Sequence, residues 1–320
     1  MDAAIMASLT DKADYGKSRL FGQLGFGLGS FIVGPLLARN MNHMFSLHAV
    51  LSLPTALLMM TLGSGGGGGQ LNNKSEDKNK DNNTETAWQV VRTSKAPAAA
   101  LTPAQEARGA VQERAARAQK ARLADEVRRV LLRPDVVVFF VAVFMAGLSS
   151  GIIETFAYVR ILEVGGTGRD LGLCRLASSV AGGPMFWLSG AISRALGVNT
   201  IIMITFVSYV LRFMIYASAS EPLHALPAEV LRGVTWAAFW ACSTYHVYHI
   251  APPGATATML GLLNGVYGGI GQSAGALLGG YLSKRHGIGR AFVLAAHGEA
   301  AVVLLFGLYL VLNKYFVLVG

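Results

Sequence analysis

The sequence predicts an all-α integral membrane protein that crosses the bilayer several times, and three observations carry this prediction. Of its 320 residues, 52% are hydrophobic and only 14% are charged. The apolar residues come in long blocks, and about 20 of them suffice for a helix to span the hydrocarbon core. Glycine-rich apolar stretches occur near both ends of the chain, and small residues on one helix face allow close packing in lipid.

Eight apolar blocks have spanning length, and together they set an orientation. An even number of spans places the first loop, the central loop and the carboxyl end on one side of the membrane. Basic residues favour the cytoplasmic side of a membrane. With the three named regions on the cytoplasmic side, a first group of basic residues fits this tendency and a second group, on the outer side, does not. The spans are 20–38, 42–62, 135–158, 171–193, 198–219, 226–249, 257–283 and 291–312. The first group is Lys12, Lys17, Arg19, Arg128, Arg129, Arg133, Arg194 and Lys314, and the second is Lys284, Arg285 and Arg290.

The formal net charge of +9 does not indicate nucleic-acid binding. Most of the basic excess lies in loops, where it favours contact with anionic lipid headgroups. Cys174 and Cys242 lie inside apolar spans without metal-ligand spacing, and the pair His246 and His249 has no third ligand nearby. We therefore predict a monomer in the lipid bilayer, with no nucleic-acid partner, no metal and no cofactor.

The central loop differs in composition from the spans on either side. Five consecutive glycines at 65–69 lead into a segment of Asn, Lys, Asp, Glu and Thr, which cannot bury enough apolar surface to fold. Thr102 is a candidate N-cap followed by Pro103, and a run of Ala, Arg, Gln and Glu predicts a surface helix to about Leu132. Its basic end is expected at the cytoplasmic headgroups.

A glycine stripe characterises the span 257–283. At about 100° per residue, its members fall within about 40° of one line along the helix. We predict that this line is a smooth groove where another helix can lie close, because small residues allow the two backbones to approach. The members are Gly261, Gly265, Gly268, Gly275 and Gly279.

The stripe has a counterpart near the start of the chain, at a constant offset of 246 residues. A duplicated helix pair explains the match, and parallel repeats are typical of one large class of transporters. Gly22, Gly25, Gly29, Gly34, Leu36 and Arg39 match Gly268, Gly271, Gly275, Gly280, Leu282 and Arg285.

Three motifs resemble one transporter family. Residues 14–22, Asp-Tyr-Gly-Lys-Ser-Arg-Leu-Phe-Gly, are similar to the loop entering its fifth helix. Residues 190–197, Gly-Ala-Ile-Ser-Arg-Ala-Leu-Gly, resemble its loop between the eighth and ninth helices, with one extra residue before the closing glycine. Residues 229–237, 251–253 and 257–262 resemble its tenth and eleventh helices. The resembled family is the major facilitator superfamily, in the branch close to the bacterial sugar and nucleoside:proton symporters.

The resemblance implies a major facilitator-type helical bundle. Residues 1–62 would be the end of the fourth helix with the fifth and sixth helices, 63–134 the cytoplasmic central loop, and 135–320 a complete six-helix second half. Counterparts of helices one to four are missing from this sequence. We therefore predict a truncated product, an incomplete gene model or a fragment.

The resemblance further implies a secondary active transporter, which moves a small polar solute, sugar-like or nucleoside-like, by alternating access. The alternative is a membrane receptor, a scaffold or an inactive fragment that transports nothing. An enzyme is not predicted, since no pairing of a nucleophile with a base and no metal-ligand spacing is visible.

Charged residues inside membrane spans cost about 2.5–3.5 kcal/mol each on insertion scales, which makes each a functional candidate. We expect Glu154 to pair with Arg175. Glu229 is expected to pair with Arg212 or Arg232. Structural ion pairs or snorkelling side chains near the outer interface explain these residues equally well. The candidates for ion coupling or ion pairing are Glu154, Arg175, Arg212, Glu229 and Glu299.

One face of the span 226–249 carries a cation, two aromatic rings, a hydroxyl and, at His246, an imidazole at helical spacing. Such a stripe suits a ring-bearing polar substrate that stacks and accepts hydrogen bonds, although aromatic residues on membrane helices also simply pack. Polar groups of the glycine-rich span are further candidates, because they would be unsatisfied in lipid. The predicted substrate-binding residues are Arg232, Trp236, Phe239, Ser243, Asn264, Tyr267 and Gln272.

Protons are a candidate coupling ion, but the sequence departs here from the resembled family. Family members often carry His or Gln where this chain has Arg232, and Gln where it has Leu260. An arginine cannot release its proton in a protein. Proton coupling would therefore rest on Glu154, Glu229 or Glu299, whose protonation can respond to their surroundings.

Overall fold

The computed structural model describes residue 119 and residues 121–319, with side chains to Lys314. The described residues from Leu123 onwards belong to one compact unit. Within this part of the chain every regular element is a helix. The predicted spans 20–38 and 42–62, the first copy of the repeat and the central loop to about residue 118 lie outside the described residues.

A short amphipathic helix over residues 121–131 precedes the bundle. Val127, Val130 and Leu131 are partly buried against the hydrophobic core. Arg128 and Arg129 are exposed on the opposite side. This helix coincides with the last part of the predicted surface helix, whose beginning lies outside the described residues.

Helix α6 (Pro134–Glu163) begins where Arg133 leaves the helical region and Pro134 takes the first helical position. Proline suits that position because its missing N–H would have no partner inside the helix. Arg133 also forms an ion pair with Asp135 at 2.8 Å. The helix has 30 residues, which at about 1.5 Å per residue gives about 45 Å and exceeds the hydrocarbon thickness.

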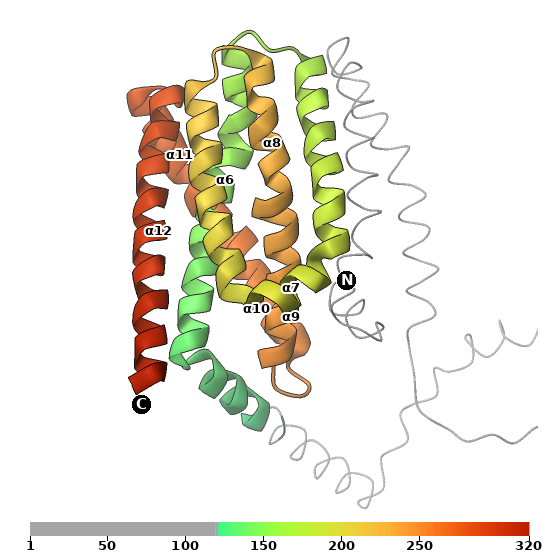
Figure 1. Ribbon diagram of the computed structural model, residues 1–320, viewed down its shortest axis with the longest axis vertical. Coiled ribbons are helices and arrows are strands. Elements are labelled where there is room, and N and C mark those ends of the chain that lie inside the picture. The colour runs from blue at the N-terminus through green and yellow to red at the C-terminus, as the bar shows by residue number, and fades with distance from the viewer. Residues whose placement is uncertain (1–118, 120, 320) are drawn as a thin grey trace, which may run out of the picture. The chain divides into compact units, whose positions relative to one another are not determined.

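Helix α7 (Gly168–Ser218) is two helices joined at Gly197. Its 51 residues are interrupted where Gly197 adopts φ 73° and ψ 165°. Figure 1 shows the segments on either side of this break running in opposite directions. The predicted spans 171–193 and 198–219 are therefore separate helices, as the sequence indicated. The first segment starts with a capping box between Thr167 and Asp170, which satisfies exposed N–H groups of the first turn.

Gly197→Ala is expected to lower the free energy of unfolding by about 1–3 kcal/mol, because its φ and ψ lie in a region almost restricted to glycine. Thermal unfolding in detergent measures the effect. Gly298→Ala is the matched control: it is exposed in a helix, and no described atom lies within 4 Å of the added carbon. There alanine is expected to stabilise by up to about 1 kcal/mol. Equal effects of the two substitutions would contradict the assignment of strain to Gly197.

The rest of the bundle consists of three further continuous helical rods, two of which contain a π-helical segment. The first rod covers the predicted span 226–249, the second 257–283 and the third 291–312. The first begins at Leu226, directly after the short helix η2. The elements are η2 (Pro222–Ala225), α8 (Leu226–Arg232), η3 (Gly233–Ala238), α9 (Phe239–Ile250), α10 (Thr256–Asn264), η4 (Gly265–Gly271), α11 (Gln272–His286) and α12 (Ile288–Val319).

The helices alternate in direction, which fits the predicted orientation. Figure 1 places the start of α6, the break in α7, the α9–α10 loop and the carboxyl end at one end of the bundle. The α6–α7, α11–α12 and η2 connections lie at the other end. Arg133, Arg194 and Lys314 therefore belong to the first end, and Lys284 and Arg285 to the second.

Within the described residues, three helices are long and apolar enough to cross a membrane, namely α6, α7 and α12. Their outward surfaces are apolar as well. On α11 and α12, Leu277, Leu304 and Leu305 are 76%, 74% and 68% exposed. Large apolar patches are rare on soluble monomers, so these surfaces fit a protein embedded in lipid.

The glycine stripe packs along only part of its predicted line. Gly275 lies so close to α6 that an added Cβ would overlap the carbonyl oxygen of Leu148, and at Gly279 it would lie 2.8 Å from the Phe156 ring. Around Gly261 and Gly265, by contrast, no described atom lies within 4 Å of an added Cβ. The predicted close approach of another helix is therefore confirmed at Gly275 and Gly279, and within the described residues it does not extend to Gly261 and Gly265.

The π-helical segment η4 is the physical reason for this difference. A π turn accommodates an extra residue, which rotates everything before it relative to everything after it. Gly271 consequently joins Gly275 and Gly279 on the contact face. On α6 the opposing small residue is Gly147, where an added Cβ would lie 2.5 Å from the Tyr267 carbonyl oxygen.

Candidate functional site

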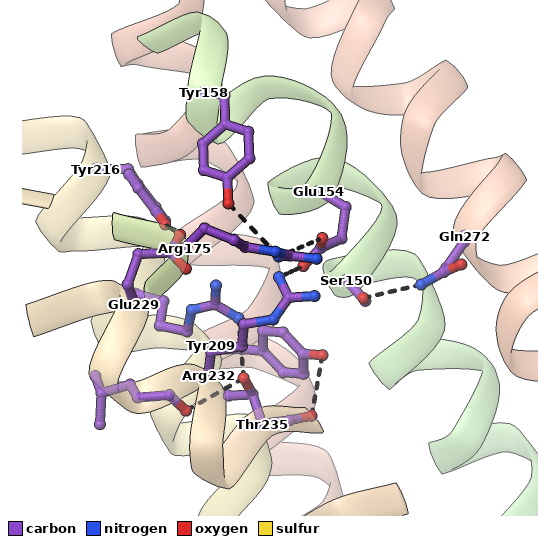
Figure 2. Close-up of polar contacts among 12 residues, drawn as sticks. Ser150, Glu154, Tyr158, Arg175, Tyr209, Tyr216, Glu229, Arg232, Thr235 and Gln272 are labelled. Carbon is purple, nitrogen blue, oxygen red and sulfur yellow. Dashed lines mark hydrogen bonds and ion pairs between the residues drawn. The ribbon is translucent and has the colours of Figure 1, made fainter. Parts of the chain in front are cut away.

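Charged side chains from α6, α7 and α8 meet inside the bundle (Figure 2). Arg212 and Glu229 are each only 1% exposed, and Arg232 is 9% exposed. Glu154 on α6 and Arg175 on α7 complete the group, which we call the charge cluster. All its members were predicted as candidates.

Glu154 is the shared partner of two arginines. Arg232 forms an ion pair with its Oε1, and Arg175 approaches its Oε2 at 3.8 Å. The Arg175 guanidinium also donates to the Tyr158 hydroxyl at 3.5 Å. The predicted pair of Glu154 with Arg175 is therefore confirmed, and Arg232 joins it from a third helix.

Glu229 has a different partner from the one predicted. Its Oε1 accepts a hydrogen bond from the Tyr216 hydroxyl at 2.5 Å. Arg212 donates to the Thr235 hydroxyl at 2.9 Å. Glu229 interacts electrostatically with Arg212 and Arg232, but no direct ion pair with either forms among the described residues. Arg232 extends across to α6 instead, and Arg212 hydrogen-bonds to the π-helical segment.

The charge cluster holds three arginines against two glutamates, which leaves one formal positive charge among these residues. Burying an ion is costly unless it is paired and hydrogen-bonded, and removing one partner of a buried pair costs about 3–5 kcal/mol. The contacts just described offset that cost. The cluster therefore ties α6, α7 and α8 together, with guanidinium donors in excess over carboxylate acceptors.

A small pocket opens on the cluster. Its volume is about 10 Å³, which suffices for about one water-sized group. The Glu154 side chain keeps 32% of its surface exposed. Glu229 Oε2 and Arg232 Nε have no hydrogen-bond partner among the described protein atoms. The lining residues are Ile153, Glu154, Ala157, Tyr158, Glu229 and Arg232. Donors and acceptors thus converge on one point, where a polar group can bind.

The predicted aromatic stripe divides between different neighbours. Trp236 packs edge-on against Phe186 of α7, with centroids 5.4 Å apart, and the Arg232 guanidinium lies 5.9 Å from its ring centroid. Phe239 instead packs against Tyr267, with centroids 5.7 Å apart. Because the π-helical segment η3 lies between α8 and α9, ideal helical spacing does not hold across it.

The other end of the stripe is also packed. His246 lies 4.8 Å from the Phe139 ring of α6, measured between centroids. Ser243 is buried, and its hydroxyl has no hydrogen-bond partner among the described atoms. Arg232 and Trp236 therefore lie at the charge cluster, while Phe239 and His246 contribute to packing.

The predicted polar residues of the second rod, formed by α10, η4 and α11, have three different environments. Gln272 donates to the Ser150 hydroxyl of α6 at 3.1 Å, beside the cluster in Figure 2. Tyr267 is buried between Phe239 and Trp240. Asn264 is exposed and donates to its own helix, at the Leu260 carbonyl oxygen, 2.8 Å away.

Glu299 lies apart from the cluster. It is 4% exposed in the middle of α12, and its Oε2 lies 2.6 Å from the Ser149 hydroxyl of α6. Its other oxygen, Oε1, has no hydrogen-bond partner among the described atoms. Among the residues predicted for ion coupling or ion pairing, Glu299 is therefore the one that lies outside the charge cluster.

Four contributors to the site lie outside the predicted set: Ser150, Tyr158, Tyr216 and Thr235. A signal for two of them is present in the sequence. Ser150, Glu154 and Tyr158 follow one another at intervals of four residues, which places them on one helix face. Tyr216 and Thr235 carry no such signal, because their partners come from other helices.

Comparison with known proteins gives two findings. The model of the family described as the MFS_1 like family matches residues 1–294. A Danio rerio protein, Major facilitator superfamily domain-containing protein 6-like, is 23% identical over 177 residues, which make up 53% of this chain and 33% of that protein. The matched region thus spans about a third of the length of this curated relative.

Proposed function

The chain belongs to the MFS_1 like family, and from that premise we propose that it is a secondary active transporter, or part of one, for a small polar solute. The family points to a transporter in the membrane rather than to an enzyme. Alternating access between two helical bundles is the proposed mechanism. The observation that carries the proposal is the charge cluster, since ionisable groups inside a membrane protein typically mark a substrate or ion pathway.

The chemistry of the cluster favours a solute that accepts hydrogen bonds. Arginines outnumber glutamates, and the Arg232 side chain lies beside the Trp236 ring. A guanidinium offers several N–H donors, and an aromatic face offers a stacking surface. We therefore propose a ring-bearing solute with hydroxyl or carbonyl oxygens, such as a sugar or a nucleoside. Arg232, Trp236 and Gln272 are the proposed contacts.

Uptake by purified protein in liposomes tests this function. The 320-residue chain and a version extended with upstream coding sequence are compared, using radiolabelled glucose and uridine as probes. We expect uptake of one probe above empty liposomes, and a loss of about tenfold or more in Arg232→Leu, because that change removes a charged hydrogen bond as well as an ion-pair partner.

Arg133→Gln is the matched control for this experiment. Arg133 is 57% exposed and pairs with Asp135 at the end of α6, away from the cluster, so its loss should leave uptake within about twofold of wild type. Equal losses in both variants would contradict a specific site at Arg232. Absence of uptake by either version would favour a receptor or scaffold that transports nothing.

A further inference from the structure

Glu299 is a buried carboxyl group that has no cation beside it among the described residues. It sits near the centre of α12, 4% exposed. Its only hydrogen-bond partner among the described residues is the Ser149 hydroxyl, at 2.6 Å from Oε2, and Oε1 has none. An ionised carboxylate in such a place lacks both solvent and a counter-charge, so the neutral acid is the favoured form.

The charged groups of the helices packed on α12 are engaged elsewhere or lie at helix ends. On α6 and α7, Glu154, Arg175 and Arg212 belong to the charge cluster. On α12 itself, the His297 ring hydrogen-bonds to the Val293 carbonyl oxygen. The remaining acidic, basic and histidine side chains of these helices are Asp135, Arg160, Glu163, Arg169, Asp170, Arg194, Lys284, Arg285, His286, Arg290 and Lys314. Their other described titratable side chains are Tyr158, Cys174, Tyr209, Tyr216, Tyr281 and Tyr309.

The other two candidate carboxyl groups differ from Glu299 in their partners. Glu154 is held by two arginines, which favour its ionised form. Glu229 accepts from Tyr216 within the same cluster. Glu229 also lies within the electrostatic reach of Arg212 and Arg232, whereas Glu299 has no charged partner among the described residues. Of the three carboxyl groups, Glu299 therefore has the surroundings that most favour a bound proton, which it would release once water reaches the group.

Helix α6 connects Glu299 to the proposed solute site. Ser149 contacts Glu299, and the next residue, Ser150, accepts a hydrogen bond from Gln272. Glu154 follows one turn later on the same helix. A movement of α6 that accompanies solute binding would therefore change the surroundings of Glu299 directly.

We propose that Glu299 is the proton-carrying group of this protein, an inference that rests on the proposed transport function. In the conformation described, its carboxyl is protonated, closed off from water and held by Ser149. A local movement of α6 within its bundle during the cycle breaks the contact of Ser149 with Glu299, and water then reaches the carboxyl, which releases its proton to that side. The carboxylate later takes up a proton from water on the other side, so that each cycle moves one proton and leaves Glu299 unchanged.

The protonation state can be tested without knowing the solute. Infrared spectroscopy of the purified protein near neutral pH should show the carbonyl stretch of a protonated carboxylic acid, which Glu299→Gln removes. Glu163→Gln, at an exposed carboxylate paired with Arg160, should leave that band unchanged. Ser149→Ala should shift it, which provides a second measurement if Glu299→Gln does not fold. Identical spectra for wild type, Glu299→Gln and Ser149→Ala would overturn the proposal.

Transport provides the second test and separates this inference from the proposed function. With the probe that is taken up, an inward proton gradient should stimulate uptake by wild type and should have no effect on Glu299→Gln, while solute exchange without a gradient persists. Glu299→Asp should restore part of the stimulation. Full stimulation in Glu299→Gln would overturn the inference while leaving transport established. Absence of all uptake would reject the transport function, and the infrared band would still decide the protonation state.

Discussion

Glu154→Gln is expected to lower the free energy of unfolding by about 3 kcal/mol, at the lower end of the range for broken buried ion pairs because the Glu154 side chain is 32% exposed. The substitution leaves Arg175 and Arg232 without the carboxylate that they share. Two neighbouring guanidinium groups then repel each other inside the bundle. Thermal or denaturant unfolding in detergent measures the change.

A double-mutant cycle identifies the interaction responsible. Arg232→Gln in the Glu154→Gln background removes one of the unpaired cations, so the double variant should be less destabilised than the sum of the two single variants. A coupling energy above about 1 kcal/mol is expected for groups in direct contact. Additive effects would show that the ion pair contributes no net interaction.

Glu163→Gln is the matched control on the same helix. The Glu163 side chain is 48% exposed, and it pairs with Arg160 three residues earlier. Exposed pairs of this kind contribute about 0–1 kcal/mol. A loss as large as that of Glu154→Gln would mean that the effect of Glu154 is not due to its place in the cluster.

Gly275→Ala is expected to destabilise the bundle by about 3 kcal/mol or more, comparable with the upper range for overpacking. An added Cβ at Gly275 would overlap the Leu148 carbonyl oxygen. Backbone cannot give way as a flexible side chain can, so α6 and α11 would have to separate. The expected result is a lower unfolding temperature and a lower yield of folded protein.

Gly261→Ala tests whether that loss depends on position. Both residues belong to the same glycine stripe, but no described atom lies within 4 Å of an added Cβ at Gly261. Alanine favours the helix by about 1 kcal/mol relative to glycine, so this variant should be neutral or slightly more stable. The reverse order of stabilities would contradict the close contact of α6 with α11.

Much of the fold could be predicted because apolar run length alone determines where a membrane helix can form. The ranges 135–158, 171–193 and 226–249 lie inside helices of the structure, and 198–219 ends one residue beyond α7. Gly197 closes the predicted loop motif and is also the residue with positive φ that separates two helices. The pair of Glu154 with Arg175 was predictable as well, since both charges were conspicuous in apolar surroundings.

The charged members of the site could be predicted from the sequence, but most of their contacts could not. Glu229 was assigned an arginine partner but hydrogen-bonds to Tyr216, and Arg232 reaches Glu154 on another helix. Opposite charges attract, but long side chains from several helices allow more than one pairing of the same glutamates and arginines. Packing decides which partner lies within reach, and a sequence pattern along one helix contains no information about its neighbours.

Taken alone, the sequence determined the helical class, the membrane environment and the charged residues of the interior, because these follow from composition and from the lengths of apolar runs. Only the tertiary structure decided which faces meet. The π-helical segments η3 and η4 rotate the residues on either side of them. Only the later part of the glycine stripe therefore faces α6, and the aromatic stripe divides between two neighbours. A periodicity argument assumes a constant 3.6 residues per turn, and the packing of the surrounding helices determines where that constancy fails.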